Sequence, residues 1–81
     1  MSKQIDLKCP WLAAEEVTAK VIKWLVREGD WVEIDQDIMV MLLDNSEFLL
    51  PSPVDGVIKA ILAEPGDPIE PDQVLAIIEL E

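Results

Sequence analysis

The chain has 81 residues, 17 of them acidic and six basic, which gives a formal net charge of −11 at pH 7. This length fits one small domain, which buries only about 60–65% of the surface of its unfolded chain. The acidity argues against nucleic acid or an anionic membrane as a partner and favours basic proteins, although it also serves simply to keep an apolar-rich domain soluble. Because no apolar run reaches the roughly 18 residues of a membrane span and no signal-peptide pattern is present, we expect a cytoplasmic protein.

The residue inventory excludes most catalytic and metal sites. Cys9 is the single cysteine and there is no histidine, so a disulfide within the chain, a zinc finger, a Cys/His dyad and a Ser/His/Asp triad are all excluded. We expect Cys9 to be a small buried hydrophobic residue. Ser46 and Ser52 have no basic partner, so we predict no catalytic residue. The acidic clusters lack the spacing of a calcium loop, which favours solvated charge over a metal site.

Short apolar runs separated by Gly, Pro, Asp and Asn predict strands, with at most one helical turn at Ala13–Glu16. The expected strands, in chain order, are Gln4–Lys8, Val17–Val26, Trp31–Glu33, Asp37–Leu43, Glu47–Leu50, Gly56–Ala63, Pro68–Glu70 and Val74–Leu80. Eight short strands at this spacing predict an all-β fold, either an antiparallel sandwich or a flattened barrel.

Most of the chain consists of two similar units, about residues 17–44 and 54–81. The stretch Gly29–Gln36 (GDWVEIDQ) returns 37 residues later as Gly66–Gln73 (GDPIEPDQ). Each unit is predicted to be a strand, a turn with the glycine at positive φ, a very short strand, a second turn and a strand. The prolines at 68 and 71 remove backbone donors and predict a sheet edge for the second short strand. Neither unit could bury its apolar face alone, so we expect one domain, residues 1–81, with internal quasi-two-fold symmetry.

The junction between the units, residues 44–53, is predicted to be a hairpin. Two apolar arms, Ile38–Leu43 and Glu47–Leu50, flank the stretch from Asp44 to Ser46. Asp and Asn tolerate the left-handed conformation of a tight turn. Pro51 and Pro53 should end the second arm.

Several separated motifs, in this order, resemble those of a lipoyl domain, the swinging-arm carrier of 2-oxo acid dehydrogenase acyltransferases. They are Lys8-Cys9-Pro10, Trp24–Val32, Asp35-Gln36, Ser52–Val57, Gly66–Ile69 and Leu75–Ile78. The resemblance runs from about Ile5 to the last residue and implies two four-stranded antiparallel sheets related by quasi-two-fold symmetry. It also implies a carrier domain of a multienzyme acyltransferase, which is not itself an enzyme. Biotinyl carrier domains share this fold, but their Met-Lys-Met tip is absent here.

The resemblance fails at the residue that carries the cofactor. The family's modified lysine lies between an Asp and a small residue, eight positions before the Pro of a Ser-Pro pair. That position here is Asn45, flanked by Asp44 and Ser46. An amide nitrogen is a poor nucleophile, so we predict no lipoyl or biotinyl group on this chain. The five lysines are all expected away from the tip: Lys3, Lys8, Lys20, Lys23 and Lys59.

The hairpin arms are unusually apolar, because Val40, Leu42 and Leu49 stand where lipoyl domains often have acidic residues. The resemblance also places the loop that contains Trp11 near the tip. The candidate interaction patch is Trp11, Leu42, Leu43, Phe48 and Leu49. These side chains mark an interface, belong to the core or are merely scattered on the surface, and the sequence leaves all three readings open. We expect Trp24 in the core, whereas Trp31 covers a sheet edge or joins a contact.

Two functions stay open, and a stand-alone enzyme is the least supported. The first is a carrier-fold domain without its covalent cofactor that acts as a non-catalytic binding or assembly module. Its partners would be components of a dehydrogenase complex, or a second copy that contacts the hairpin. The second is an excised or engineered lipoyl domain, with Lys changed to Asn, whose native role is swinging-arm acyl transfer. Leu80-Glu81 falls where a longer chain would run into a linker.

Overall fold

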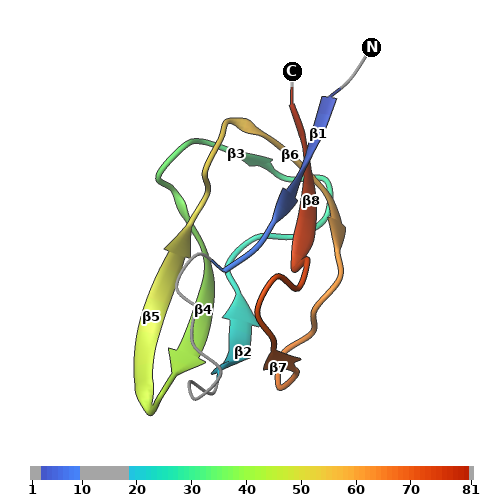
Figure 1. Cartoon of the computed structure of the whole chain (residues 1–81). Coiled ribbons are helices and arrows are strands. Elements are labelled where there is room, and N and C mark those ends of the chain that lie inside the picture. Colours follow the sequence, from blue (N-terminus) through green and yellow to red (C-terminus); the bar gives the residue numbers. More distant parts are fainter. Residues whose placement is uncertain (1–2, 10–18, 81) are drawn as a thin grey trace.

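A computed structural model of the chain describes residues 3–9 and 19–80, which form two four-stranded antiparallel sheets (Figure 1). The strands are β1 (Lys3–Leu7), β2 (Ala19–Trp24), β3 (Trp31–Val32), β4 (Asp37–Leu43), β5 (Ser46–Pro51), β6 (Gly56–Ile61), β7 (Pro68–Ile69) and β8 (Ala76–Leu80). The first sheet has the order β1-β8-β6-β3 and the second has the order β5-β4-β2-β7. The all-β prediction is therefore confirmed, and β4 has the bounds expected from the sequence. The predicted helical turn at Ala13–Glu16 lies outside the described residues.

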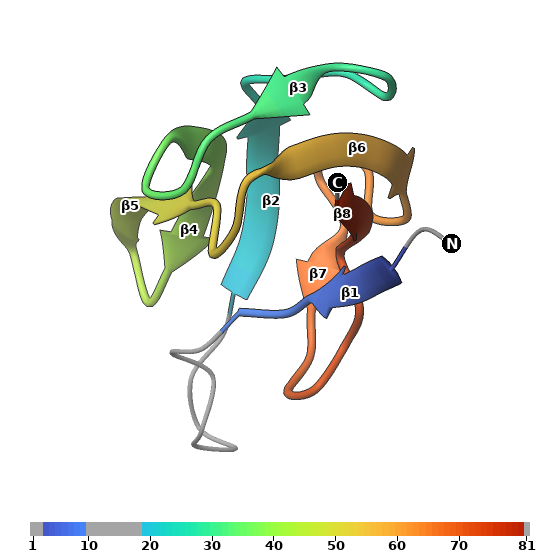
Figure 2. The same ribbon diagram turned by 90° about the horizontal axis from the view of Figure 1, so that it is seen from above.

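The core lies between the two sheets, which Figure 2 shows from above with β4 and β5 on one side and β1, β6 and β8 on the other. Val21 and Met41 are cross-strand partners in the second sheet, and Ile58 and Ile78 are partners in the first. All four side chains are completely buried. They stand at equivalent positions of the two sequence units. Both units therefore contribute to a shared apolar core, which also contains Leu7, Cys9 and Leu50 from outside the units.

The two units also exchange matching backbone hydrogen bonds where they cross. The amide of Gly29 donates to the carbonyl of Ile58 at 2.7 Å, and the amide of Gly66 donates to the carbonyl of Val21 at the same distance. Both glycines have positive φ, +93° and +91°. This backbone conformation favours glycine because it has no Cβ, and it confirms the turn predicted at each glycine.

The very short strands β3 and β7 lie at equivalent edges of the two sheets. Pro68 begins β7, in agreement with the edge position predicted from its missing backbone donor. Trp24 packs against the core, and its indole N–H donates to the carbonyl of Ala63 at 2.7 Å. Cys9 is buried, as predicted, with its Sγ 3.7 Å from Sδ of Met41.

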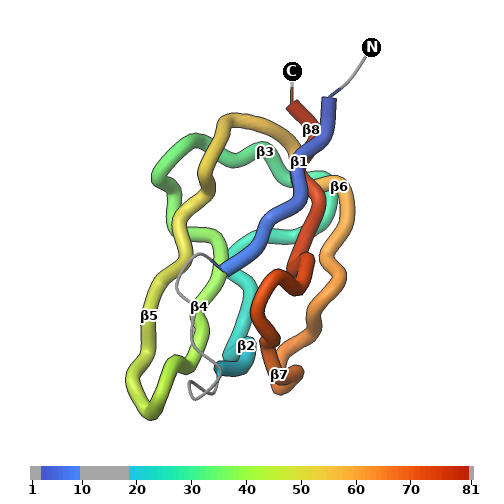
Figure 3. The backbone as a smooth tube through the Cα atoms, viewed as in Figure 1, coloured from blue at the N-terminus to red at the C-terminus, as the bar shows by residue number. Residues whose placement is uncertain are grey.

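The molecule measures 39 × 20 × 20 Å along its principal axes. The turn between β4 and β5 lies at one end of the long direction (Figure 3). The beginning of β1 and the end of β8 lie at the other end. None of the described residues belongs to a helix that could cross a membrane.

Candidate functional site

The β4–β5 hairpin ends in a two-residue turn, Asp44-Asn45. Leu43 and Ser46 are the last paired residues of its two strands. Ser46 therefore belongs to β5, one residue earlier than the sequence predicted for this strand. Asp44 and Asn45 have φ values of +50° and +72°. Positive φ at both central positions is typical of the type I′ turn, whose twist matches that of the flanking strands, and Asp and Asn accept it better than most residues.

The turn presents Asp44, Asn45 and Ser46 to solvent, since all three residues are exposed. Their functional groups are a carboxylate, a carboxamide and a hydroxyl. None of these is an amine that could form an amide with a carboxylic acid such as lipoate or biotin. Between Lys23 and Lys59 the sequence contains no lysine, so the entire hairpin lacks one.

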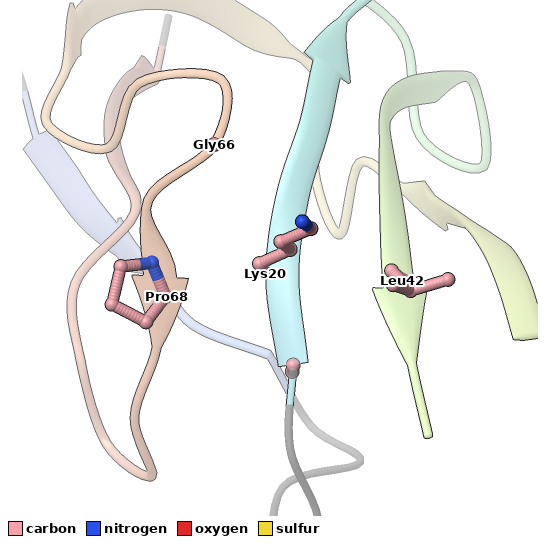
Figure 4. A pocket seen from close by; sticks show the side chains of 5 residues that line it. Lys20, Leu42, Gly66 and Pro68 are labelled. Atoms are coloured by element: carbon pink, nitrogen blue, oxygen red, sulfur yellow. The ribbon is translucent and has the colours of Figure 1, made fainter. Parts of the chain in front are cut away.

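The lysine nearest the turn by strand register is Lys20 in β2. It is the cross-strand partner of Leu42, two residues before the turn. Figure 4 shows Lys20 between Leu42 of β4 and Pro68 of β7, and these three residues line a shallow groove with Ala19 and Gly66. Lys20 therefore extends from the middle of a sheet and not from the end of a projecting turn.

The residue of β4 that lies opposite Lys20 could not be predicted from the sequence. The pairing of β2 with β4 shifts register between Val21 and Lys23. Because β2 and β4 are not consecutive in the chain, no short turn fixes their register. The apolar pattern alone therefore could not say which residue of β4 lies opposite Lys20.

The candidate interaction patch is divided between exposed and half-buried side chains. Phe48 and Leu49 are 42% and 49% exposed. Leu42 and Leu43 are half-buried, and Leu43 also packs against the core. Trp11 lies outside the described residues, so its predicted place beside the hairpin is not described.

The exposed leucine of the patch lies on the outer face of the second sheet. Leu49 is paired with Val40, which is buried, and Val40 is paired in turn with Lys23. These residues line a shallow pocket together with Ile22, Glu47 and Phe48. The hairpin thus has an apolar strip on this face, with one basic and one acidic residue beside it.

The acidic clusters of the sequence were the other candidate sites, as possible ligands of a metal ion. In the described part of the chain, no three acidic, Cys or His residues lie close enough to hold a metal ion. Asp35 and Asp72 instead occupy equivalent turns at positive φ, +70° and +65°. The predicted pair Glu15-Glu16 lies outside the described residues.

Comparison with known proteins agrees with the hairpin and the two-sheet architecture. The family model described as "Biotin-requiring enzyme", which covers biotin and lipoyl domains, matches residues 5–78. The chain belongs to the biotin/lipoyl domain family. Members of this family carry biotin or lipoate on a lysine and are carriers, not catalysts, within larger enzymes.

Similar curated proteins are acyltransferase components of 2-oxo acid dehydrogenase complexes. The dihydrolipoyllysine-residue acetyltransferase component of the pyruvate dehydrogenase complex of Corynebacterium glutamicum is 35% identical over 73 residues, which are 90% of this chain and 11% of that protein. Its counterpart in Haemophilus influenzae is 34% identical over 79 residues, 98% of this chain and 13% of that protein. The succinyltransferase component of the 2-oxoglutarate dehydrogenase complex of Buchnera aphidicola is 32% identical over 71 residues, 88% of this chain and 17% of that protein. The chain thus spans well under a fifth of the length of these relatives.

Proposed function

We propose that this chain is a lipoyl-type carrier domain that holds no covalent cofactor and acts as a non-catalytic binding or assembly module. The observation that carries this proposal is the turn Asp44-Asn45, which has the exposure of a cofactor-bearing tip but no amine. By resemblance, Asn45 stands where the family has its attachment lysine. The amide nitrogen of Asn45 is not basic, because its lone pair is delocalised into the carbonyl, so it does not attack an activated acyl group.

The proposal is tested by the intact mass of the chain after co-expression with a lipoate ligase and lipoate. We expect the unmodified mass for the chain as it stands and a lipoyl mass increase for Asn45→Lys. Asn45→Arg is the matched control, because it restores the positive charge but supplies no acylatable amine. A lipoyl group on the unsubstituted chain would refute the proposal, and peptide mapping would then show whether Lys20 carries it.

The Asn45→Lys variant also separates two reasons for the absence of a cofactor. Modification would mean that the ligase still recognises the hairpin and that only the nucleophile is missing. If Asn45→Lys remains unmodified, the apolar arms around the turn have also diverged from what the ligase recognises.

A second candidate function is that of an excised or engineered lipoyl domain from a 2-oxo acid dehydrogenase acyltransferase. The small share of each acyltransferase relative that this chain covers, 11% to 17% in the three compared, supports it. The native role would then be swinging-arm acyl transfer, with lysine at position 45. The genomic sequence decides between the two candidates. An Asn codon at position 45 supports the first, and a Lys codon followed by an open frame past Glu81 supports the second.

As a binding module, the domain would use the outer face of the hairpin. The exposed leucine Leu49 and the half-buried Leu42 supply apolar surface there, and contiguous apolar surface of this kind is typical of interfaces. We propose that its partner is either a component of a dehydrogenase complex or a second copy of this chain.

A further inference from the structure

A second apolar surface lies at the end of the molecule away from the hairpin turn. It is a shallow groove lined by Trp31, Ile34, Pro53, Val54, Asp55 and Leu80. Figure 1 shows the elements that supply these residues, namely β3, the connection after it, the connection between β5 and β6, and the end of β8, gathered at the end opposite the β4–β5 turn. The six residues of β5 separate this groove from Asn45, a rise of about 20 Å. The groove is therefore independent of the cofactor position.

The groove exposes two large apolar side chains. Trp31 is 46% exposed and Ile34 is 56% exposed, which is the largest value among the exposed large hydrophobic residues of the described chain. Val54 and Leu80, which also line the groove, are half-buried. Trp31 stands in the edge strand β3, so no further strand covers it in the described structure. Tryptophan is among the residues most enriched at the centre of protein interfaces.

Hydrogen bonds hold the two loops of the groove in place. The amide of Ile34 donates to Oδ1 of Asp55 at 2.8 Å, which links the two walls directly. Next to it, the amide of Asp35 donates to the carbonyl of Ser52 at 2.8 Å. The buried hydroxyl of Ser52 donates to the carbonyl of Val54 at 2.6 Å. Because the walls are already fixed in the free chain, binding a ligand would require little further ordering of these loops and so a small entropic cost.

Negative charge dominates the loops that form the groove, and the basic residue nearest to it by strand register is Lys3, the exposed cross-strand partner of Leu80. From Glu28 to Ile58 the sequence has eight acidic residues and no lysine or arginine. Three of these carboxylates, Glu33, Asp35 and Asp55, are exposed on the loops that form the groove. The next lysine along the chain, Lys59, is already paired with Glu79 at 3.8 Å. An apolar groove with this rim is complementary to a ligand that is both apolar and basic, and it repels acidic ligands.

We propose that this groove binds a short basic segment of a partner protein. An aliphatic side chain of the segment would lie on Trp31 and Ile34, and its lysine or arginine residues would pair with Glu33, Asp35 and Asp55. A cation could also lie over the exposed indole of Trp31, an arrangement that adds attraction beyond the apolar contact. A second copy seated groove to groove is a poor occupant, because its Glu33, Asp35 and Asp55 would then face the same three carboxylates.

The test uses the whole 81-residue chain and two short fluorescein-labelled peptides. One peptide alternates lysine with leucine, and the other alternates glutamate with leucine. Fluorescence anisotropy should show binding of the lysine peptide only, with an affinity that falls as salt is added. Trp31→Ala should weaken that binding about tenfold or more, the usual result of truncating an interface anchor. Asp55→Asn should weaken it less and reduce its salt dependence, because asparagine keeps the acceptor for Ile34 but removes the charge.

Leu62→Ala is the matched control, because Leu62 is 52% exposed and does not line the groove. This variant should bind the lysine peptide as the unsubstituted chain does. Circular dichroism on each variant checks that the fold is intact. Equal binding of both peptides, or equal losses in Trp31→Ala and Leu62→Ala, would overturn the proposal. It would also be overturned if Trp31→Ala abolished self-association of the chain and left peptide binding unchanged, since the occupant would then be a second copy.

Discussion

At the scale of single residues, Asn45 fits its turn better than a lysine would. Its φ of +72° lies in the left-handed region, where most residues with a side chain are strained by about 1–2 kcal/mol and Asn is strained least. In this chain the amine is absent and the turn has a residue suited to its backbone.

Substitutions at position 45 should therefore change stability in opposite directions. We expect Asn45→Lys to lower the free energy of unfolding by about 1 kcal/mol and Asn45→Gly to raise it by about 0.5 kcal/mol, because Asp-Gly is a favoured type I′ pair. Urea unfolding followed by tryptophan fluorescence measures both changes. If Asn45→Lys matched the unsubstituted chain, the turn would not hold positive φ at this position in solution.

At the scale of elements, the two sequence units build the same turn with the same side chain. Oδ2 of Asp30 accepts a hydrogen bond from the amide of Arg27, and Oδ2 of Asp67 accepts one from the amide of Glu64, both at 2.9 Å. Each bond closes the turn that leads into a short edge strand. The repeat in the sequence therefore preserves a turn geometry and not a catalytic group.

Removing either carboxylate should have the same effect in both units. We expect Asp30→Ala and Asp67→Ala each to lower the free energy of unfolding by about 1 kcal/mol, the usual contribution of one such hydrogen bond. The matched variants Asp30→Asn and Asp67→Asn keep an acceptor and should lose less. Chemical unfolding of the four variants checks this. A loss confined to one unit would show that the two turns are not energetically equivalent.

The sequence predicted these elements well because their signals are local. The turns depend on Gly29, Gly66 and the Asp-Asn pair, because these residue types accept positive φ at little cost whatever surrounds them. The division into two four-stranded sheets and their place in a carrier domain came from the resemblance, and the order of the strands within each sheet was not predicted. Neither composition nor spacing contains that information.

The exposure of the hairpin side chains could not be predicted in the same way. Leu49 and Leu50 are neighbours of the same type, yet Leu49 is exposed and Leu50 is buried. Which of them faces the core depends on the register of β5 against β4, and that pairing is shifted between Asp37 and Met39. Such a shift is not visible in an apolar run, because a one-residue change exchanges the two faces of the strand.

At the scale of the whole molecule, charge and shape separate two apolar surfaces. The domain is about twice as long as it is wide. The apolar face of the hairpin around Leu49 lies toward one end, and the groove around Trp31 lies at the other. Acidic residues outnumber basic ones by 17 to six, so two copies repel each other at low ionic strength. A net charge of this sign favours the approach of basic partners over acidic ones.

If a second copy is the partner at the hairpin, its binding should depend on salt in a defined direction. About 0.5 M NaCl reduces the screening length to roughly 4 Å, which removes most of the repulsion between copies and leaves the apolar contact. We expect sedimentation equilibrium to show a monomer at low salt and a growing dimer fraction at high salt. Leu49→Glu should prevent the dimer, because a carboxylate would then be buried in the contact.

The control for this experiment is Leu62→Glu, which makes the same charge change at a leucine of similar exposure outside the hairpin. This variant should still dimerise at high salt. A chain that remains monomeric at every salt concentration would leave a component of a larger complex as the partner for the hairpin. If Leu49→Glu and Leu62→Glu lost the dimer equally, the cause would be the added net charge. The hairpin would then not be the contact surface.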